Sequence, residues 1–131
     1  TLLILSYLQR VYSGRSAGKI RAEKQQLTDR VTAYIESHFA QNITIADLSR
    51  QFYVSESTIS HQFRQKMGLS LYRYITQRRL IAAKTHIQSG APLEQVSRDV
   101  GFADYSTFYR AFKQEFGISP RRYRELQGGE R

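Results

Sequence analysis

The sequence contains no cysteine and no tryptophan, and only two prolines occur among its 131 residues. Without cysteine the chain can form neither a disulfide nor a thiolate metal site, which fits a reducing compartment. Its longest apolar run, Leu2 to Leu5, is far too short to cross a bilayer. The chain opens on Thr1 with none of the charged and apolar regions of a signal peptide, so we expect it to be a piece of a longer protein.

Acidic residues are scarce as well. Only 11 Asp and Glu stand against 20 Lys and Arg, which leaves a formal net charge of +9. A domain this basic usually binds a polyanion, nucleic acid in the first place and an anionic membrane surface in the second. Apolar residues make up 40% of the chain, enough for a modest core, and the length suits a single domain.

Apolar residues recur with helical period almost throughout, and no stretch alternates as a strand does. We therefore predict an all-α fold. The apolar stripe over residues 2–12 predicts a short helix, and we assign residues 1–13 to the end of an interdomain or dimerisation helix. Residues 14–26 are basic, dotted with Gly and Ser and without apolar rhythm, which predicts a linker. The domain proper is expected over residues 27–127.

Capping residues and apolar periods divide this domain into helices. Ser55 is a good cap for a helix that follows it, and Gly90 is a good stop for the helix before it. The expected helices are one from about Leu27, two short ones within residues 44–67, a long one over about 71–88, two more within 93–116 and one from Pro120.

One stretch of sequence occurs twice. Residues 57–70 read STISHQFRQKMGLS and residues 106–119 read STFYRAFKQEFGIS, at a constant offset of 49 (106 − 57). At about 100° per residue, Ile59, Phe63 and Met67 share one face of a helix, and polar side chains occupy the opposite face. The second copy likewise places its apolar side chains on one face of a helix and its polar side chains on the opposite face. The identical positions are Ser57 and Ser106, Thr58 and Thr107, Phe63 and Phe112, Gln65 and Gln114, Gly68 and Gly117, and Ser70 and Ser119.

Each copy follows a short helix and a tight turn, and this order is the plan of a helix-turn-helix, whose second helix enters the major groove of DNA. In the earlier part of the repeat the offset is 48 (96 − 48), so the second turn is one residue longer. The connecting helix, about 18 residues at ~1.5 Å each, is roughly 27 Å long. With its flanking turns it would place the two recognition helices about one duplex turn, ~34 Å, apart. We interpret the repeat as two helices for two successive major grooves.

The outward positions of both copies are the candidate DNA contacts, because short polar and cationic side chains read base edges and bind phosphates. Base contacts are expected from Ser57, Ser60, His61, Tyr105, Ser106, Tyr109 and Arg110. Phosphate contacts are expected from Ser55, Arg64, Thr107, Lys113 and Arg121. For Arg121, as for Arg122 and Arg124, a solvated helix face is an equally open interpretation.

Residues 100–124, VGFADYSTFYRAFKQEFGISPRRYR, closely resemble the signature of the AraC/XylS-type bacterial transcription regulators. The resemblance covers about residues 27–126. It implies two helix-turn-helix motifs that bind double-stranded DNA, no enzymatic activity, no cofactor, and usually activation of transcription through RNA polymerase. It also implies an effector-binding domain outside this chain, a homodimer formed through that domain, and a cytoplasmic location at the nucleoid. His61 stands where the family commonly has Arg, so we expect the first recognition helix to read bases less strongly.

Other patterns have weaker support. GRSAG at residues 14–18 matches the nucleophile elbow of hydrolases, but an elbow needs a strand before it, and no strand is predicted. His38, His61 and His86 lie far apart in sequence with no i, i+4 pair, so no metal site is expected. The rival from a different class is a basic helical module that binds proteins or a membrane surface, with residues 2–12 as an interfacial anchor.

Overall fold

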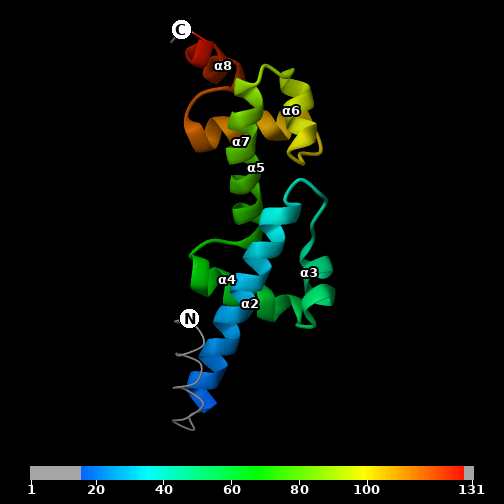
Figure 1. The fold of residues 1–131 in the computed structure, drawn as a ribbon, viewed down its shortest axis with the longest axis vertical. Helices are drawn as coiled ribbons and strands as arrows, with labels where there is room; N and C mark the ends of the chain where they lie inside the picture. The colour runs from blue at the N-terminus through cyan, green and yellow to red at the C-terminus, as the bar shows by residue number, and fades with distance from the viewer. Residues whose placement is uncertain (1–15, 129–131) are drawn as a thin grey trace. The chain divides into compact units, whose positions relative to one another are not determined.

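The computed structural model describes residues 16–128, whose only regular secondary structure is helical (Figure 1). The predicted all-α fold is therefore confirmed. The helix expected over residues 2–12 lies outside the described residues. The helices are α2 (Ser16–His38), α3 (Ile45–Phe52), α4 (Glu56–Met67), α5 (Leu71–Gln88), α6 (Leu93–Asp99), α7 (Tyr105–Phe116) and α8 (Pro120–Gly128).

The start expected for the helix from about Leu27 is wrong, because α2 begins at Ser16. The assignment of residues 14–26 to a linker between domains stays a prediction. The reason for the earlier start lies in intrinsic helix propensity. Most of residues 16–26 are Ala, Lys, Arg, Glu or Gln, which favour a helix without any buried face, and Gly18 is the main exception. The missing apolar period therefore did not argue against a helix.

The described chain forms two compact units, each with one helix-turn-helix. The first unit contains α2 up to Tyr34 and residues Ile45–Ser70, and hence α3 and α4. The second contains Ile35–Thr44 and the chain from Leu71 onward, and hence α5 to α8. The end of α2 thus belongs to the same unit as the connecting helix α5, which has the bounds predicted from the sequence.

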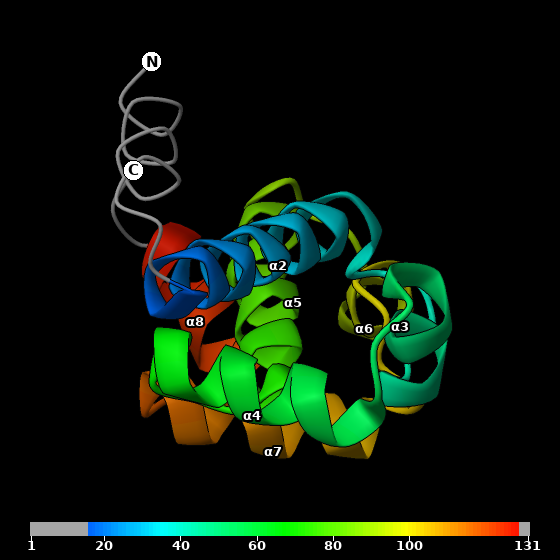
Figure 2. The ribbon, with the colours of Figure 1, turned by 90° about the horizontal axis from the view of Figure 1, so that it is seen from below.

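Apolar side chains from three helices form the core of the first unit. Val31 of α2, Leu48 of α3, and Ile59 and Phe63 of α4 are each at most 1% exposed. Full burial of a side chain of this size contributes about 1.5–3 kcal/mol. Figure 2 shows α2 and α4 on opposite sides of this unit, so one face of α4 is turned away from α2. The packing therefore fixes which side of α4 remains accessible.

Aromatic and aliphatic side chains form the core of the second unit. Phe108 and Phe112 of α7 are fully buried, with ring centroids 5.7 Å apart. Tyr123 of α8 meets Phe112 at 5.8 Å. Both α7 and α8 also contact α5. The buried cluster comprises Leu80, Ala83, Ile87, Val96, Val100, Phe102, Phe108 and Phe112.

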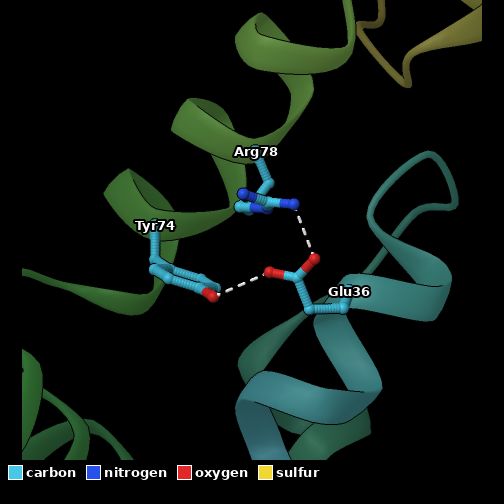
Figure 3. Close-up of polar contacts among 3 residues, drawn as sticks. All are labelled: Glu36, Tyr74 and Arg78. Carbon is cyan, nitrogen blue, oxygen red and sulfur yellow. Dashed lines mark hydrogen bonds and ion pairs between the residues drawn. The ribbon is translucent and has the colours of Figure 1, made fainter.

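The second unit also holds the end of α2 against α5 (Figure 3). The Tyr74 hydroxyl donates to one carboxylate oxygen of Glu36 at 3.0 Å, and the Arg78 guanidinium donates to the other at 2.6 Å. Burial and the bond to Glu36 raise the pKa of the Tyr74 hydroxyl, so it remains a donor. Because the Arg78–Glu36 pair is partly exposed, it stabilises by only ~0–1 kcal/mol and chiefly fixes geometry.

Arg79, the next residue of α5, binds the chain that follows α2. Its Nε donates to the carbonyl oxygen of Phe39 at 2.6 Å, and its Nη2 donates to that of Gln41 at 2.8 Å. Gly101 packs against the same site, where a Cβ would lie 2.8 Å from Arg79 Nε and 2.9 Å from the oxygen of Ala40. Since its φ is also +107°, this position suits only glycine. The turn of the second helix-turn-helix is thus fixed against α5.

Candidate nucleic-acid interface

Both ends of α4 are capped. The Ser55 hydroxyl accepts a hydrogen bond from the backbone N–H of Thr58 at 3.0 Å and donates to the Thr58 hydroxyl at 2.7 Å. Gly68, with a φ of +79°, ends the helix in the left-handed conformation, and its N–H donates to the carbonyl oxygen of Arg64. The prediction that Ser55 caps this helix is confirmed.

The ends of α7 repeat this arrangement. The Asp104 carboxylate accepts from the N–H of Thr107 at 2.7 Å. Gly117 has a φ of +79°, and its N–H donates to the carbonyl oxygen of Lys113 at 2.8 Å. Both helices contain 12 residues, and each boundary of α7 lies 49 residues after that of α4 (105 − 56 and 116 − 67). The sequence repeat is therefore a repeat of structure that extends to the caps.

The turns before the two helices differ by one residue, as predicted. In the first turn the Val54 N–H donates to the carbonyl oxygen of Ser49 at 3.2 Å, and in the second the Phe102 N–H donates to that of Ser97 at 2.9 Å. These bonds lie 48 residues apart (102 − 54), whereas the helix caps that follow lie 49 apart (104 − 55). Ala103 is therefore the additional residue.

The burial of Ile59 and Phe63 leaves a small, polar face of α4 outside. The predicted contacts lie on it: Ser57, His61 and Arg64 are exposed, and Ser60 is half-buried on the flank. Hydroxyls and an imidazole can donate or accept hydrogen bonds, but this face offers only one permanent cation, Arg64. The expectation of weak base reading by the first recognition helix stays a prediction.

The outer face of α7 is more cationic. With Phe108 and Phe112 buried, Arg110 and Lys113 both project from the opposite side. Among the predicted contacts, Ser106, Tyr109, Arg110 and Lys113 are exposed, whereas Tyr105 and Thr107 are half-buried. Arg is the side chain whose two parallel donors best match the O6 and N7 atoms of guanine. Of the two helices, α7 presents the side chains better suited to contact base edges.

The arginines at the start of α8 have different surroundings. Arg121 is exposed and stays a predicted phosphate contact. Arg122 lies 3.4 Å from the carboxylate of Glu125, an exposed pair of little energetic weight. Arg124 is half-buried and donates to the carbonyl oxygen of Ala91, beyond the end of α5. Arg124 therefore holds the fold together, which neither interpretation of the sequence anticipated.

A negative charge stands at the N-terminus of α7. The hydrogen bonds from Thr107 lower the pKa of the Asp104 carboxyl, and the nearby charge of Arg110 lowers it further. Asp104 is therefore ionised at neutral pH, in the position where the helix dipole favours an anion. The matching cap of α4, Ser55, is neutral. The N-caps of the two helices have the same geometry and differ in charge.

Neither a metal centre nor a membrane span is found in residues 16–128. No group of three His, Asp or Glu side chains there could hold a metal ion, and His38 and His86 lie half-buried at the edge of the core. No helix of the same stretch is long and apolar enough to cross a membrane. The interfacial anchor considered for residues 2–12 lies outside it.

A family model described as a helix-turn-helix domain matches residues 48–126, a range that contains α4, α7 and the connecting helix α5. The chain belongs to the AraC-type helix-turn-helix family. Proteins of this family are transcription regulators, and the AraC-type domain is a DNA-binding domain and not an enzyme.

Two curated relatives illustrate the AraC-type match. "Probable transcriptional regulator LumQ" from Photobacterium leiognathi is 36% identical over 91 residues, which cover 69% of this chain and 37% of the relative. "HTH-type transcriptional activator RhaS" from Escherichia coli O1:K1 / APEC is 34% identical over 98 residues, which cover 74% of this chain and 35% of the relative. The chain spans little more than a third of the length of these relatives.

Solved structures agree with the AraC-type fold. The C-terminal domain of AraT, a response regulator from Geobacillus stearothermophilus, has a TM-score of 0.74 at 28% identity, over 76% of this chain and 84% of that one. The DNA-binding domain of AdpA, solved in complex with a target DNA, has a TM-score of 0.75 at 21% identity, over 79% of this chain and 95% of that one. At that identity the AdpA likeness shows the fold alone.

Two features near the candidate contacts of this AraC-type domain were missed in the sequence. Asp104 carried a usable signal, because Asp before a predicted helix is a preferred cap. Tyr53, in the first turn, carried none: its backbone has a φ of +56°, and its side chain is 93% exposed. A tyrosine in the left-handed region is uncommon enough that sequence rules do not place it there.

Proposed function

We propose that this chain is the DNA-reading part of a bacterial transcription regulator, and that α4 and α7 enter two successive major grooves of double-stranded DNA. One observation carries the proposal. Two helices of equal length have matching caps at an offset of 49 residues, and each turns an accessible polar face outward. A structural role alone does not require a second capped helix with an accessible polar face, whereas contact with two successive grooves does.

Within this proposal the outward residues divide by chemistry. On α4, Ser57, Ser60 and His61 would contact base edges, with Ser55 and Arg64 on phosphates. On α7, Arg110 would be the strongest base contact, supported by Tyr105, Ser106 and Tyr109, with Thr107, Lys113 and Arg121 on phosphates. This division follows the general rule that phosphate contacts position a protein on the duplex and base contacts give it sequence specificity.

The regulatory role is proposed with the function. A relative of 34% identity is named a transcriptional activator, so we propose that the whole protein activates transcription and contacts RNA polymerase. Since the chain spans little more than a third of its relatives, the effector-binding and dimerising domain would lie in the remainder of the protein. Such a regulator would work in the cytoplasm, at the nucleoid.

Binding to duplexes across a range of salt tests this function. Neutralisation of phosphates releases counterions, so log K should fall linearly with log salt, with a slope of about −0.9 for each phosphate neutralised. A duplex chosen by in vitro selection from a random library should in addition bind at least ~10³-fold more tightly than random duplex. A basic module without sequence recognition would show the slope and bind both duplexes equally, and that result would contradict the proposal.

A further inference from the structure

The turn between α3 and α4 contains the only described non-glycine residue with a positive φ, Tyr53 at +56°. The left-handed conformation is unfavourable for residues with a Cβ, and most turns that require it use Gly or Asn. A residue kept in such a conformation is normally maintained by its surroundings, or it serves a contact that the free protein does not make.

The turn accounts for the backbone conformation, because the Val54 N–H donates to the carbonyl oxygen of Ser49 around Tyr53, but no packing requires a tyrosine at this position. The Tyr53 side chain is 93% exposed, the largest exposure among the large apolar or aromatic side chains that the structure describes. The matching position in the second turn, 48 residues later, is Gly101, whose surroundings leave no room for a Cβ. The first helix-turn-helix therefore presents an aromatic ring with a hydroxyl at a point where the second cannot present any side chain.

The place of the turn indicates what Tyr53 would meet. When a helix-turn-helix docks, its first helix crosses the sugar–phosphate backbone and the N-terminal part of its second helix enters the groove. The chain between the two helices therefore runs along the rim of the groove, where the phosphates are. Tyr53 stands two residues before Ser55, the N-cap of α4, on this segment. Tyrosine hydroxyls are among the donors that bind phosphate oxygens in protein–DNA complexes.

We propose that the Tyr53 hydroxyl donates a hydrogen bond to a phosphate oxygen at the rim of the groove that α4 occupies, an inference that rests on the proposed function. Tyr53 is then a positioning residue. It anchors a helix whose outward positions, Ser57, Ser60 and His61, offer only uncharged or weakly basic groups for base contacts. The second helix-turn-helix has Arg110 at the position that corresponds to His61 (61 + 49) and does not depend on such an anchor.

Tyr53→Phe tests the contact by removing only the hydroxyl. We expect affinity to fall by about three- to ten-fold, the effect of one lost hydrogen bond, equally on the selected duplex and on random duplex. A scan with single methylphosphonates should then identify one phosphate whose neutralisation weakens the wild type and leaves Tyr53→Phe unchanged. The matched control is Tyr74→Phe, which removes a hydroxyl bonded to Glu36. It should lower thermal stability and leave the affinity of the folded protein unchanged.

A second variant separates binding from stability. Asn tolerates the left-handed region, so Tyr53→Asn should melt at or above the wild-type temperature while it binds DNA as weakly as Tyr53→Phe. A lower melting temperature with unchanged affinity would assign Tyr53 a structural role and overturn the proposal. Wild-type affinity in purified Tyr53→Phe would overturn it as well, including the case in which Tyr53 serves a protein partner. A wild-type chain without sequence-specific binding would instead remove the proposed function together with this contact.

Discussion

Arg110 is the side chain on which base reading should depend most. It is exposed on α7, opposite the buried Phe108 and Phe112. We expect Arg110→Ala to weaken binding to the selected duplex by about 1–3 kcal/mol and to relax the preference at one base pair. Binding to a set of single-base variants of the duplex measures both effects.

Lys113→Ala, one turn further along the same helix, is the matched control for Arg110→Ala. As a predicted phosphate contact, its loss should weaken all sequences alike and reduce the salt slope by ~1. If Arg110→Ala gives this same uniform pattern, Arg110 binds a phosphate and the assignment to a base is wrong.

Asp104 should make the stability of α7 depend on pH. Because the folded protein lowers the pKa of this carboxyl, its contribution is present above the unfolded value of 3.8 and is lost as pH falls through the folded pKa. Asp104→Asn keeps an oxygen that can accept from Thr107 and removes the charge. We expect melting temperatures of wild type and variant to differ at pH 7 and to converge as pH falls below the lowered pKa of the folded protein. Parallel curves over this range would show that the charge of Asp104 does not contribute.

Gly101 should be far less tolerant of substitution than Gly90. Both have a positive φ, +107° and +90°, but an added Cβ meets nothing at Gly90 and meets Arg79 and the Ala40 oxygen at Gly101. We expect Gly90→Ala to lower the free energy of unfolding by about 1 kcal/mol from backbone strain alone, and Gly101→Ala by roughly 2–4 kcal/mol. Denaturant unfolding measures both, and equal losses would mean that the close contact at Gly101 relaxes without penalty.

Residue-level prediction from the sequence succeeded where the signal was local. Ser55 was identified as a cap because a cap depends on the residues that follow it within one turn. Arg79 gave no such signal, since the carbonyl groups it binds, those of Phe39 and Gln41, lie about forty residues earlier in the chain. Arg124 was misread for the same reason.

At the scale of helices, periodicity and caps predicted the bounds of α5 and the repeat of α4 in α7, because each of these helices buries an apolar stripe. The start of α2 was wrong because its first half follows propensity and has no such stripe. The contact of Glu36 with Tyr74 and Arg78 could not be predicted, because it depends on how two helices distant in sequence meet.

The continuity of α5 should be necessary for reading two grooves. One Ala inserted after Ala82 rotates the chain beyond it by ~100° and lengthens it by ~1.5 Å. This separates Leu80 from Ala83 and Ile87, which share one buried cluster. In a variant that circular dichroism shows to be folded, we expect the DNA footprint to shrink to one half-site and affinity to fall toward the non-specific range.

The matched control for this insertion is one Ala placed after Ser89, beyond the end of α5. A loop absorbs an added residue far better than a helix does, so this variant should keep most of its affinity. An Ala82 insertion variant that folds and keeps the full footprint would contradict the need for a continuous connecting helix.

For the molecule as a whole, we expect the net charge of +9 to attract DNA of any sequence and the two helix-turn-helix units to select the sequence that is bound. The units are alike in helix length and caps and unlike in chemistry. Arg64 of the first unit corresponds to Lys113 of the second, but the first has His61 where the second has Arg110, and Tyr53 stands beside its helix. We therefore expect sequence preference to be stronger in the half-site that α7 contacts.

The most direct test of two-groove binding is hydroxyl-radical footprinting of the wild-type chain on the duplex obtained by in vitro selection. The account predicts two protected segments on one face of the duplex, with centres about 10 base pairs, or ~34 Å, apart, since successive major grooves recur once per helical turn. A single protected segment, with no loss of affinity when the other half-site is randomised, would contradict it.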